Sequence, residues 1–130
     1  MADSAHQRDD IARQIVDSAL AVHRALGPGL LESVYEQCLA YELRGRGIHV
    51  RTQVAVPIRY RDAQIEAGFR LDMIVGDLVV VEVKAIEKLM PVHEAQLLTY
   101  LKFSQFHLGL LINFNVVLIK HGIKRMIVGA

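Results

Sequence analysis

Apolar residues recur every three or four positions near the N-terminus, the spacing of a helix that buries one face. Asp9 and Asp10 suit the start of this helix, and Gly27-Pro28-Gly29 then interrupts it, because glycine and proline favour turns. A second helix is predicted over about residues 30–44, with apolar residues on nearly all faces, which indicates burial. The first series consists of Ile11, Ile15, Ala19, Val22 and Leu26.

Further along, apolar and other side chains alternate, which is the period-two pattern of β-strands. Pro57 cannot donate a backbone hydrogen bond, so the first of these strands is expected at a sheet edge or with a bulge. Three strands are predicted in this region, over residues 48–60, 65–75 and 78–86.

The last third combines a helix over about residues 92–103 with short apolar runs. The runs predict strands over residues 108–114 and 116–120, and a short further strand over residues 126–128. The order α, α, β, β, β, α, β, β predicts an α/β (α+β) fold.

With 130 residues, 52% of them hydrophobic, the chain is long enough for one globular domain over residues 1–130. Cys38 is the only cysteine, which excludes an internal disulfide and suits a reducing compartment. The polar N-terminus lacks the apolar core of a secretion signal, and no run approaches the roughly 18 apolar residues that span a membrane. We therefore expect a soluble cytoplasmic protein that makes no membrane contact.

The net charge of +1 does not by itself indicate a nucleic-acid partner. The distribution of charge is more informative, because no acidic residue follows Glu94, whereas basic residues continue to the C-terminal region. Such groups attract phosphates, although most are solvated surface. The two basic groups are Lys102, Lys120, Lys124 and Arg125, and Arg44, Arg46, Arg51, Arg59 and Arg61.

Charged residues lie inside two of the apolar strands. Asp72 precedes a Gly-Asp turn, and Glu82 and Lys84 follow it on the next strand, where a period of two places both on one face. Ionised groups in hydrophobic strands are costly when they have no partner. A hard divalent cation between the carboxylates, with Lys84 near its water or a substrate phosphate, would explain them.

Two helices carry further candidates. Glu32 and Glu36 are four residues apart on one helix face and could complete a cation site, or they could be exposed or paired with arginines. Gln96 and Tyr100 have the same spacing and suit hydrogen bonds to a lysine or phosphate, although such pairs are often simple helix contacts. Tyr35 is interpreted as core packing.

Several other chemistries are not indicated, since the chain has no GxGxxG or P-loop sequence, no zinc-ligand spacing and no GxSxG turn. In contrast, Asp72 with Glu82-Val83-Lys84 resembles the Asp-x(n)-Glu-x-Lys signature of the PD-(D/E)XK nuclease superfamily. The pair Gln96-x-x-x-Tyr100 is similar to a motif of its RecB-like members. Leu71 stands where the superfamily usually has a proline before the first aspartate.

The segment from Gly29 to Tyr35 reads G-x-x-E-x-x-Y and resembles the bacterial GxxExxY protein family, which is assigned to the same superfamily. The resemblance covers nearly the whole chain. It implies a restriction-endonuclease-like αβββαβ core, with a mixed sheet flanked by helices. It also implies a nuclease that hydrolyses phosphodiester bonds in nucleic acid, with DNA as the first hypothesis and RNA left open.

In that reading Asp72, Glu82 and the Val83 carbonyl bind Mg²⁺ or Mn²⁺, and Lys84 orients the attacking water. Glu36 is expected to serve the metal, because it precedes Gly47 by a spacing similar to that in archaeal resolvases of the superfamily. Glu32 is its nearest competitor. The remaining pair, Gln96 and Tyr100, would brace Lys84 or the phosphate.

Two alternatives remain open. The fold could serve as a non-enzymatic module that binds nucleic acid or protein, because fold does not determine function. The enzyme could also act as a homodimer, since a duplex presents two strands and the apolar C-terminal strands could form an interface.

Overall fold

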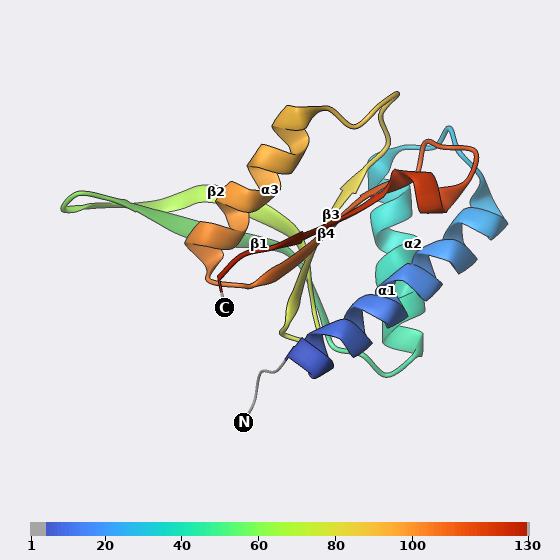
Figure 1. Cartoon of the computed structure of the whole chain (residues 1–130), viewed down its shortest axis with the longest axis horizontal. Coiled ribbons are helices and arrows are strands. Elements are labelled where there is room, and N and C mark those ends of the chain that lie inside the picture. The colour runs from blue at the N-terminus through green and yellow to red at the C-terminus, as the bar shows by residue number, and fades with distance from the viewer. Residues whose placement is uncertain (1–4, 130) are drawn as a thin grey trace.

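The computed structural model describes residues 5–129 and contains three α-helices and a five-stranded sheet (Figure 1). The elements follow the predicted order except near the C-terminus. They are α1 (Ala5–Leu26), α2 (Glu32–Gly45), β1 (Val50–Tyr60), β2 (Ala63–Val75), β3 (Val79–Lys84), α3 (Pro91–Ser104), β4 (Leu108–Asn113), the 3₁₀ turn η1 (Ile119–Gly122) and β5 (Ile123–Ile127).

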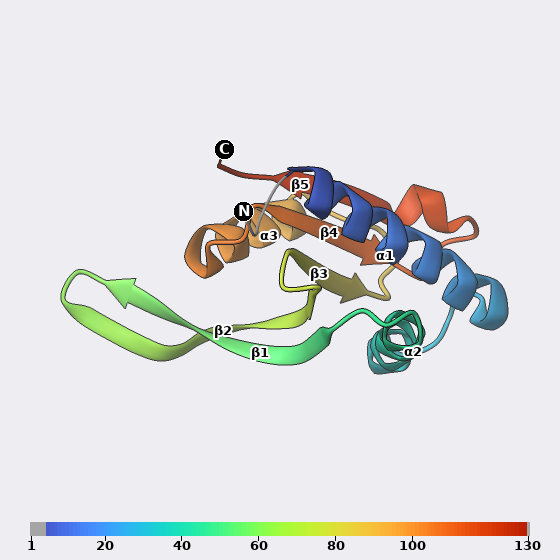
Figure 2. The same cartoon turned by 90° about the horizontal axis from the view of Figure 1, so that it is seen from below.

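The sheet has the strand order β1-β2-β3-β4-β5. Strands β3 and β4 are parallel because α3 connects them as a crossover, and all other neighbours are antiparallel. Helices α1 and α2 pack on one face of this mixed sheet and α3 packs on the other (Figures 1 and 2). The predicted mixed sheet flanked by helices is therefore confirmed, and it is consistent with a restriction-endonuclease-like core.

Strand β3 lies at the centre of the sheet and its valines are buried on both faces. Val79, Val81 and Val83 pack in the core beneath α1 and α2, whereas Val80 packs in the core beneath α3. This parity is the one that the sequence predicts. It places Glu82, in the same row as Val80, inside the protein rather than on its surface.

The Gly-Asp turn between β2 and β3 has the expected hairpin geometry. Gly76 and Asp77 both have positive φ angles, 61° and 57°, as the two central residues of a type I′ turn require. A Cβ atom on Gly76 would lie 2.9 Å from the Ile11 side chain of α1, so glycine also permits this close contact. The turn fixes the register in which β3 returns beside β2.

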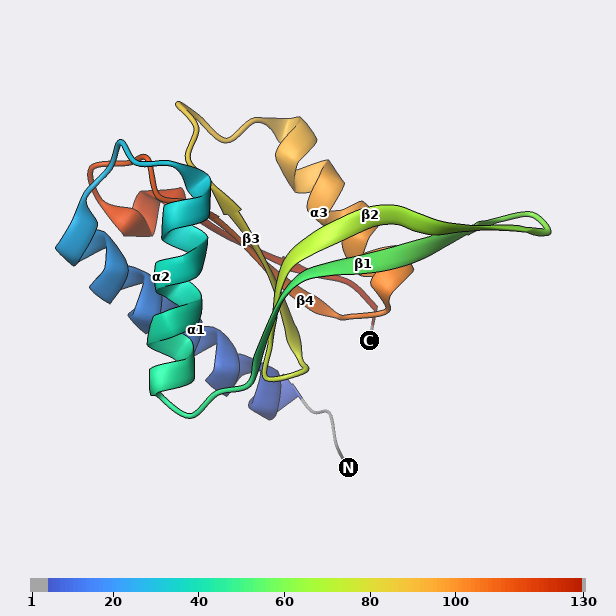
Figure 3. The same cartoon turned by 180° about the vertical axis from the view of Figure 1, so that it is seen from behind.

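Strands β1 and β2 continue past the rest of the sheet as a hairpin arm (Figures 2 and 3). Strand β1 is an edge strand, and its pairing with β2 shifts register between Val56 and Ile58. The predicted edge or bulge at Pro57 is thus confirmed. Phe69 at the base of the arm stacks on Tyr100 of α3, with ring centroids 4.4 Å apart.

The strand predicted over residues 116–120 is wrong. The chain instead bends there and forms η1, and the Val116 carbonyl accepts a hydrogen bond from the His23 ring of α1 rather than from a neighbouring strand. Gly122 then passes so close to the Asn113 backbone that a Cβ atom would overlap it. Tertiary contacts therefore outweigh the strand preference of the β-branched residues in this segment. Strand β5 begins at Ile123, three residues before the short strand predicted over residues 126–128.

Two helix starts differ from their predicted positions. Helix α1 already includes Ala5, the first residue that the structure describes, so Asp9 and Asp10 lie beyond its first turn. Helix α2 begins at Glu32, two residues after the approximate start predicted near residue 30, because Leu31 still has an extended backbone with φ −71° and ψ 148°.

Candidate metal and active site

The site forms where β2 and β3 separate. Their last backbone pair is Met73 with Val81. Beyond it, the Asp72 backbone N–H donates to Glu82 Oε2 over 3.0 Å, and the Val83 N–H donates to Asp72 Oδ2 over 2.8 Å. Two side-chain carboxylates thus replace carbonyl groups as acceptors, and they lie side by side on adjacent antiparallel strands.

Lys84 ends β3 and faces the same carboxylates. Its positive charge lowers the pKa of both Asp72 and Glu82, although it makes no ion pair with any carboxylate in residues 5–129. Its ammonium group is therefore near the pair and still has its donors available. The structure thus brings Asp72, Glu82 and Lys84 together.

Burial dominates the electrostatics of the pair. Burial, followed by the negative charge of Asp72, raises the pKa of Glu82 to about 8, and the positive charge of Lys84 lowers it by less than these two effects raise it. Burial also raises the pKa of Asp72, against the lowering by the Val83 N–H and by Lys84. The single nearby ammonium does not compensate two carboxylates in this environment.

Helix α2 brings Glu32 and Glu36 to the same place. The Glu36 carboxylate is half-buried and accepts hydrogen bonds from Gln53 Nε2 on both oxygens, over 2.9 and 3.0 Å. Burial raises the pKa of Glu36, with further raising by Asp72 and Glu32. Glu32 Oε2 accepts the Ala85 backbone N–H over 3.2 Å, one residue after Lys84.

Tyr100 of α3 closes the opposite side of the site. Burial raises its pKa, and the charges of Glu82 and Asp72 raise it further, so the phenol faces the two carboxylates. Its stack on Phe69 holds the ring there. Gln96 lies one helical turn earlier and is half-buried, but within residues 5–129 no hydrogen bond joins its amide to Lys84 or the carboxylates. The predicted role of Gln96 stays a prediction.

Gln53 is a site residue that the sequence does not reveal. Besides bonding Glu36, its side chain also lowers the pKa of the Asp72 carboxyl. Its backbone has a φ of 53°, and it interrupts the β1–β2 pairing between Thr52 and Val54. A left-handed conformation costs a non-glycine residue of order 1 kcal/mol, and such strain gathers at functional sites.

Two buried polar residues support the end of β3 and the start of α2. Asn113 accepts the Ile86 N–H over 3.0 Å and donates to the Ile86 carbonyl over 2.9 Å, which fixes the chain just after Lys84. The Tyr35 hydroxyl donates to the Gly27 carbonyl and accepts the Leu30 N–H, while its ring is buried. Tyr35 therefore holds the turn that positions Glu32, in keeping with its interpretation as a core residue.

The donor set suits a hard divalent cation, because it consists of carboxylate oxygens, and a bound cation would offset the burial and mutual repulsion that raise their pKa values. Across residues 5–129, however, no group of three or more His, Cys, Asp or Glu side chains is arranged to hold a metal ion. Two carboxylates that leave several positions to water and substrate phosphate are typical of Mg²⁺ sites, whereas Ca²⁺ takes more protein oxygens. The residues thus fit a metal of the Mg²⁺ type.

Comparison with known families gives one match. A family model described as the PD-(D/E)XK nuclease superfamily matches residues 9–126, which include every candidate site residue. Comparisons with curated proteins and with solved structures found no match. Among residues 5–129, no helix is long and apolar enough to cross a membrane.

Proposed function

The chain belongs to the PD-(D/E)XK nuclease superfamily, and on this premise we propose that it hydrolyses phosphodiester bonds in DNA with Mg²⁺ or Mn²⁺. The observation that carries the proposal is the pair of buried carboxylates, Asp72 and Glu82, at the point where β2 and β3 separate beside Lys84. This arrangement contributes nothing evident to packing, and it suits chemistry on a charged substrate.

Each residue has a role in this proposal. Asp72, Glu82, the Val83 carbonyl and Glu36 would hold the metal, which supplies Lewis-acid stabilisation of the phosphate charge when bound. Lys84 donates to the attacking water and to the charge that develops on the phosphate oxygens.

The groups around the metal position would orient those ligands. Gln53 holds the Glu36 carboxylate, and Tyr100 faces the substrate side of the two strand carboxylates. Gln96, one turn before Tyr100, would contact Lys84 or the phosphate once substrate is bound.

We further assign the chain to the GxxExxY group of this superfamily. The motif residues support the assignment, because the glycine-rich turn, Glu32 and Tyr35 act together. Tyr35 fastens the turn at Gly27, and Glu32 then reaches the backbone of Ala85 beside the catalytic lysine. The motif thus connects α2 to the end of β3.

Wild-type protein is expected to gain several degrees of melting temperature in millimolar Mn²⁺ or Mg²⁺, because a cation that binds only the folded state stabilises it by mass action. Asp72→Asn is expected to lose most of this gain together with DNA cleavage. The measurements are thermal melting with and without metal, and cleavage of duplex, single-stranded and branched DNA. A melting temperature unaffected by metal, with no cleavage of any substrate, would favour the non-enzymatic binding module.

Glu36→Gln is expected to weaken Mn²⁺ binding about 10-fold or more, and Glu32→Gln by less, because Glu36 lies deeper and already interacts with both strand carboxylates. Isothermal titration with Mn²⁺ measures both affinities. A larger loss in Glu32→Gln would reverse the assignment, and equal affinity in both variants and wild type would remove α2 from the metal site.

A further inference from the structure

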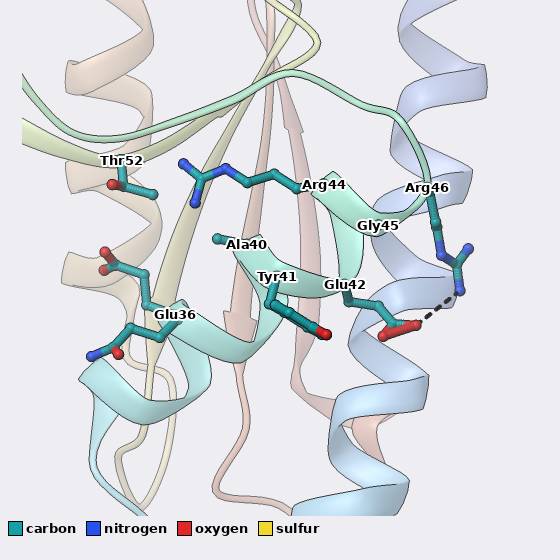
Figure 4. A pocket seen from close by; sticks show the side chains of 9 residues that line it. Glu36, Ala40, Tyr41, Glu42, Arg44, Gly45, Arg46 and Thr52 are labelled. Atoms are coloured by element: carbon teal, nitrogen blue, oxygen red, sulfur yellow. Dashed lines mark ion pairs between the residues drawn. The ribbon is translucent and has the colours of Figure 1, made fainter.

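A groove of about 760 Å³ runs along α2 from the candidate site towards the end of the helix (Figure 4). Glu36 lines this groove and also interacts with the carboxylates of Asp72 and Glu82, so the groove lies next to the candidate site. The opposite wall is β1, through Thr52. The lining residues are Glu36, Gln37, Ala40, Tyr41, Glu42, Arg44, Gly45, Arg46 and Thr52.

Arg44 is the available cation of this groove. It donates to the Val50 carbonyl over 2.9 Å, and it has no carboxylate partner within residues 5–129. Arg46, by contrast, pairs with Asp17 over 2.8 Å and with Glu42 over 3.8 Å. Figure 4 shows the two arginines turned apart, with Arg44 directed towards Thr52 on the side of Glu36.

Tyr41 lies one helical turn before Arg44 and is 80% exposed. No other aromatic ring in the described part of the chain stacks on it. In Figure 4 its side chain leaves α2 between those of Glu36 and Glu42. An exposed aromatic ring beside an unpaired arginine is the combination with which proteins bind unpaired bases and their backbone.

The length of the groove fits such a strand. Glu36 and Arg44 are eight residues apart on one helix, which corresponds to about 12 Å at 1.5 Å per residue. A nucleic-acid strand rises about 3.4 Å per nucleotide in B-form, so the distance covers about three to four nucleotides. The two acidic residues in the lining do not prevent a phosphate from binding, since Glu42 is ion-paired with Arg46 and Glu36 is assigned to the proposed metal site.

We propose that the groove along α2 binds a single-stranded nucleic-acid segment next to the bond to be cleaved, with a base stacked on Tyr41 and a backbone phosphate on Arg44. The position of the cleaved bond rests on the proposed nuclease function. A paired base inside a duplex keeps its faces stacked on its neighbours, so Tyr41 selects unpaired over fully paired substrates. The substrate class is therefore DNA with an end, flap or junction that supplies about three unpaired nucleotides.

The test is fluorescence anisotropy with three labelled DNAs: a short single strand, a blunt duplex of the same sequence, and that duplex with a single-stranded overhang of about four nucleotides. Binding is measured in EDTA and again with Ca²⁺, which carboxylates also bind. Wild type is expected to bind the single strand and the overhang more tightly than the blunt duplex.

Tyr41→Ala is expected to weaken binding of the single strand and the overhang about 5-fold or more, and binding of the blunt duplex less than about 2-fold. Arg44→Gln is expected to reduce the slope of the logarithm of single-strand affinity against the logarithm of salt concentration by the amount that corresponds to about one phosphate contact. Arg46→Gln is the matched control, because it removes the same charge from the same groove but from an arginine already paired; its effect should be less than about 2-fold. Melting temperatures establish that each variant is folded.

Equal effects of Tyr41→Ala on single-stranded and blunt DNA, or no binding of any of the three DNAs in either buffer, would overturn the inference. The nuclease proposal fails separately. If binding depends on Tyr41 and Arg44 but no DNA is cleaved in Mg²⁺ or Mn²⁺, the groove inference stands and the nuclease proposal is contradicted. If Tyr41→Ala leaves cleavage of every substrate unchanged, the nuclease proposal stands and the groove inference is contradicted.

Discussion

Lys84→Ala is expected to slow metal-dependent DNA cleavage about 100-fold or more, because it removes the ammonium group that, alone among residues 5–129, acts on both strand carboxylates. Lys84 is half-buried and makes no ion pair within residues 5–129, so its loss should leave the fold intact. Single-turnover cleavage with saturating Mg²⁺ or Mn²⁺ measures the chemical step rather than binding or product release.

The matched control is Lys88→Ala, because Lys88 is an exposed lysine in the segment that follows β3. It removes the same charge a few residues away and should change the cleavage rate less than about 2-fold. Comparable losses in both variants would indicate general attraction of DNA by positive charge. Unchanged cleavage in Lys84→Ala, with a normal melting temperature, would contradict the role proposed for Lys84.

Glu82→Gln is expected to stabilise the protein at alkaline pH in EDTA. Burial and the charge of Asp72 raise the pKa of Glu82 to about 8 in the folded protein, from 4.5 as the ordinary value. Between these values the folded state holds a proton that the unfolded state has released. The free energy of unfolding of the wild type therefore falls as pH rises through this range, by roughly 1 kcal/mol per pH unit.

Glutamine carries no charge at any pH and retains an oxygen that can accept the Asp72 N–H. The variant should therefore lack this slope and exceed the wild type by about 3 to 4 kcal/mol near pH 9, with the difference disappearing towards pH 5. Urea unfolding in EDTA at a series of pH values gives the comparison.

With Mn²⁺ present the order of stability should reverse. Metal ligands must be deprotonated, so the wild type gains stability from Mn²⁺ increasingly as pH rises, whereas Glu82→Gln loses most of that gain. Glu87→Gln, at an exposed position after β3, is the control and should follow the wild type under both conditions. An identical pH slope in Glu82→Gln and wild type would mean that Glu82 is ionised in the metal-free folded protein.

The order of the major elements and the core of the site follow from local sequence patterns. A period of two along β3 places Glu82 and Lys84 on one face, and the Gly-Asp turn returns that strand beside Asp72. These features depend only on residues close in the chain, because strand parity and turn geometry are local properties. The helical spacing of Glu32 and Glu36 likewise predicts that both reach the same place, as the pKa shifts of Asp72 and Glu82 show.

Other features depend on contacts between distant segments, and no local pattern encodes them. Gln53 reaches the site because the long β1–β2 pairing opens at this residue, which has a positive φ. The 116–120 segment is not a strand, because His23 of α1 bonds the Val116 carbonyl and the Asn113 backbone packs against Gly122. The groove of Tyr41 and Arg44 exists only because α2 packs beside β1. The sequence by itself determined the two strands that carry the carboxylates and lysine, since their spacing is local. The tertiary structure alone decided which distant side chains complete the site, since burial and hydrogen-bond partners arise only when separate elements pack together.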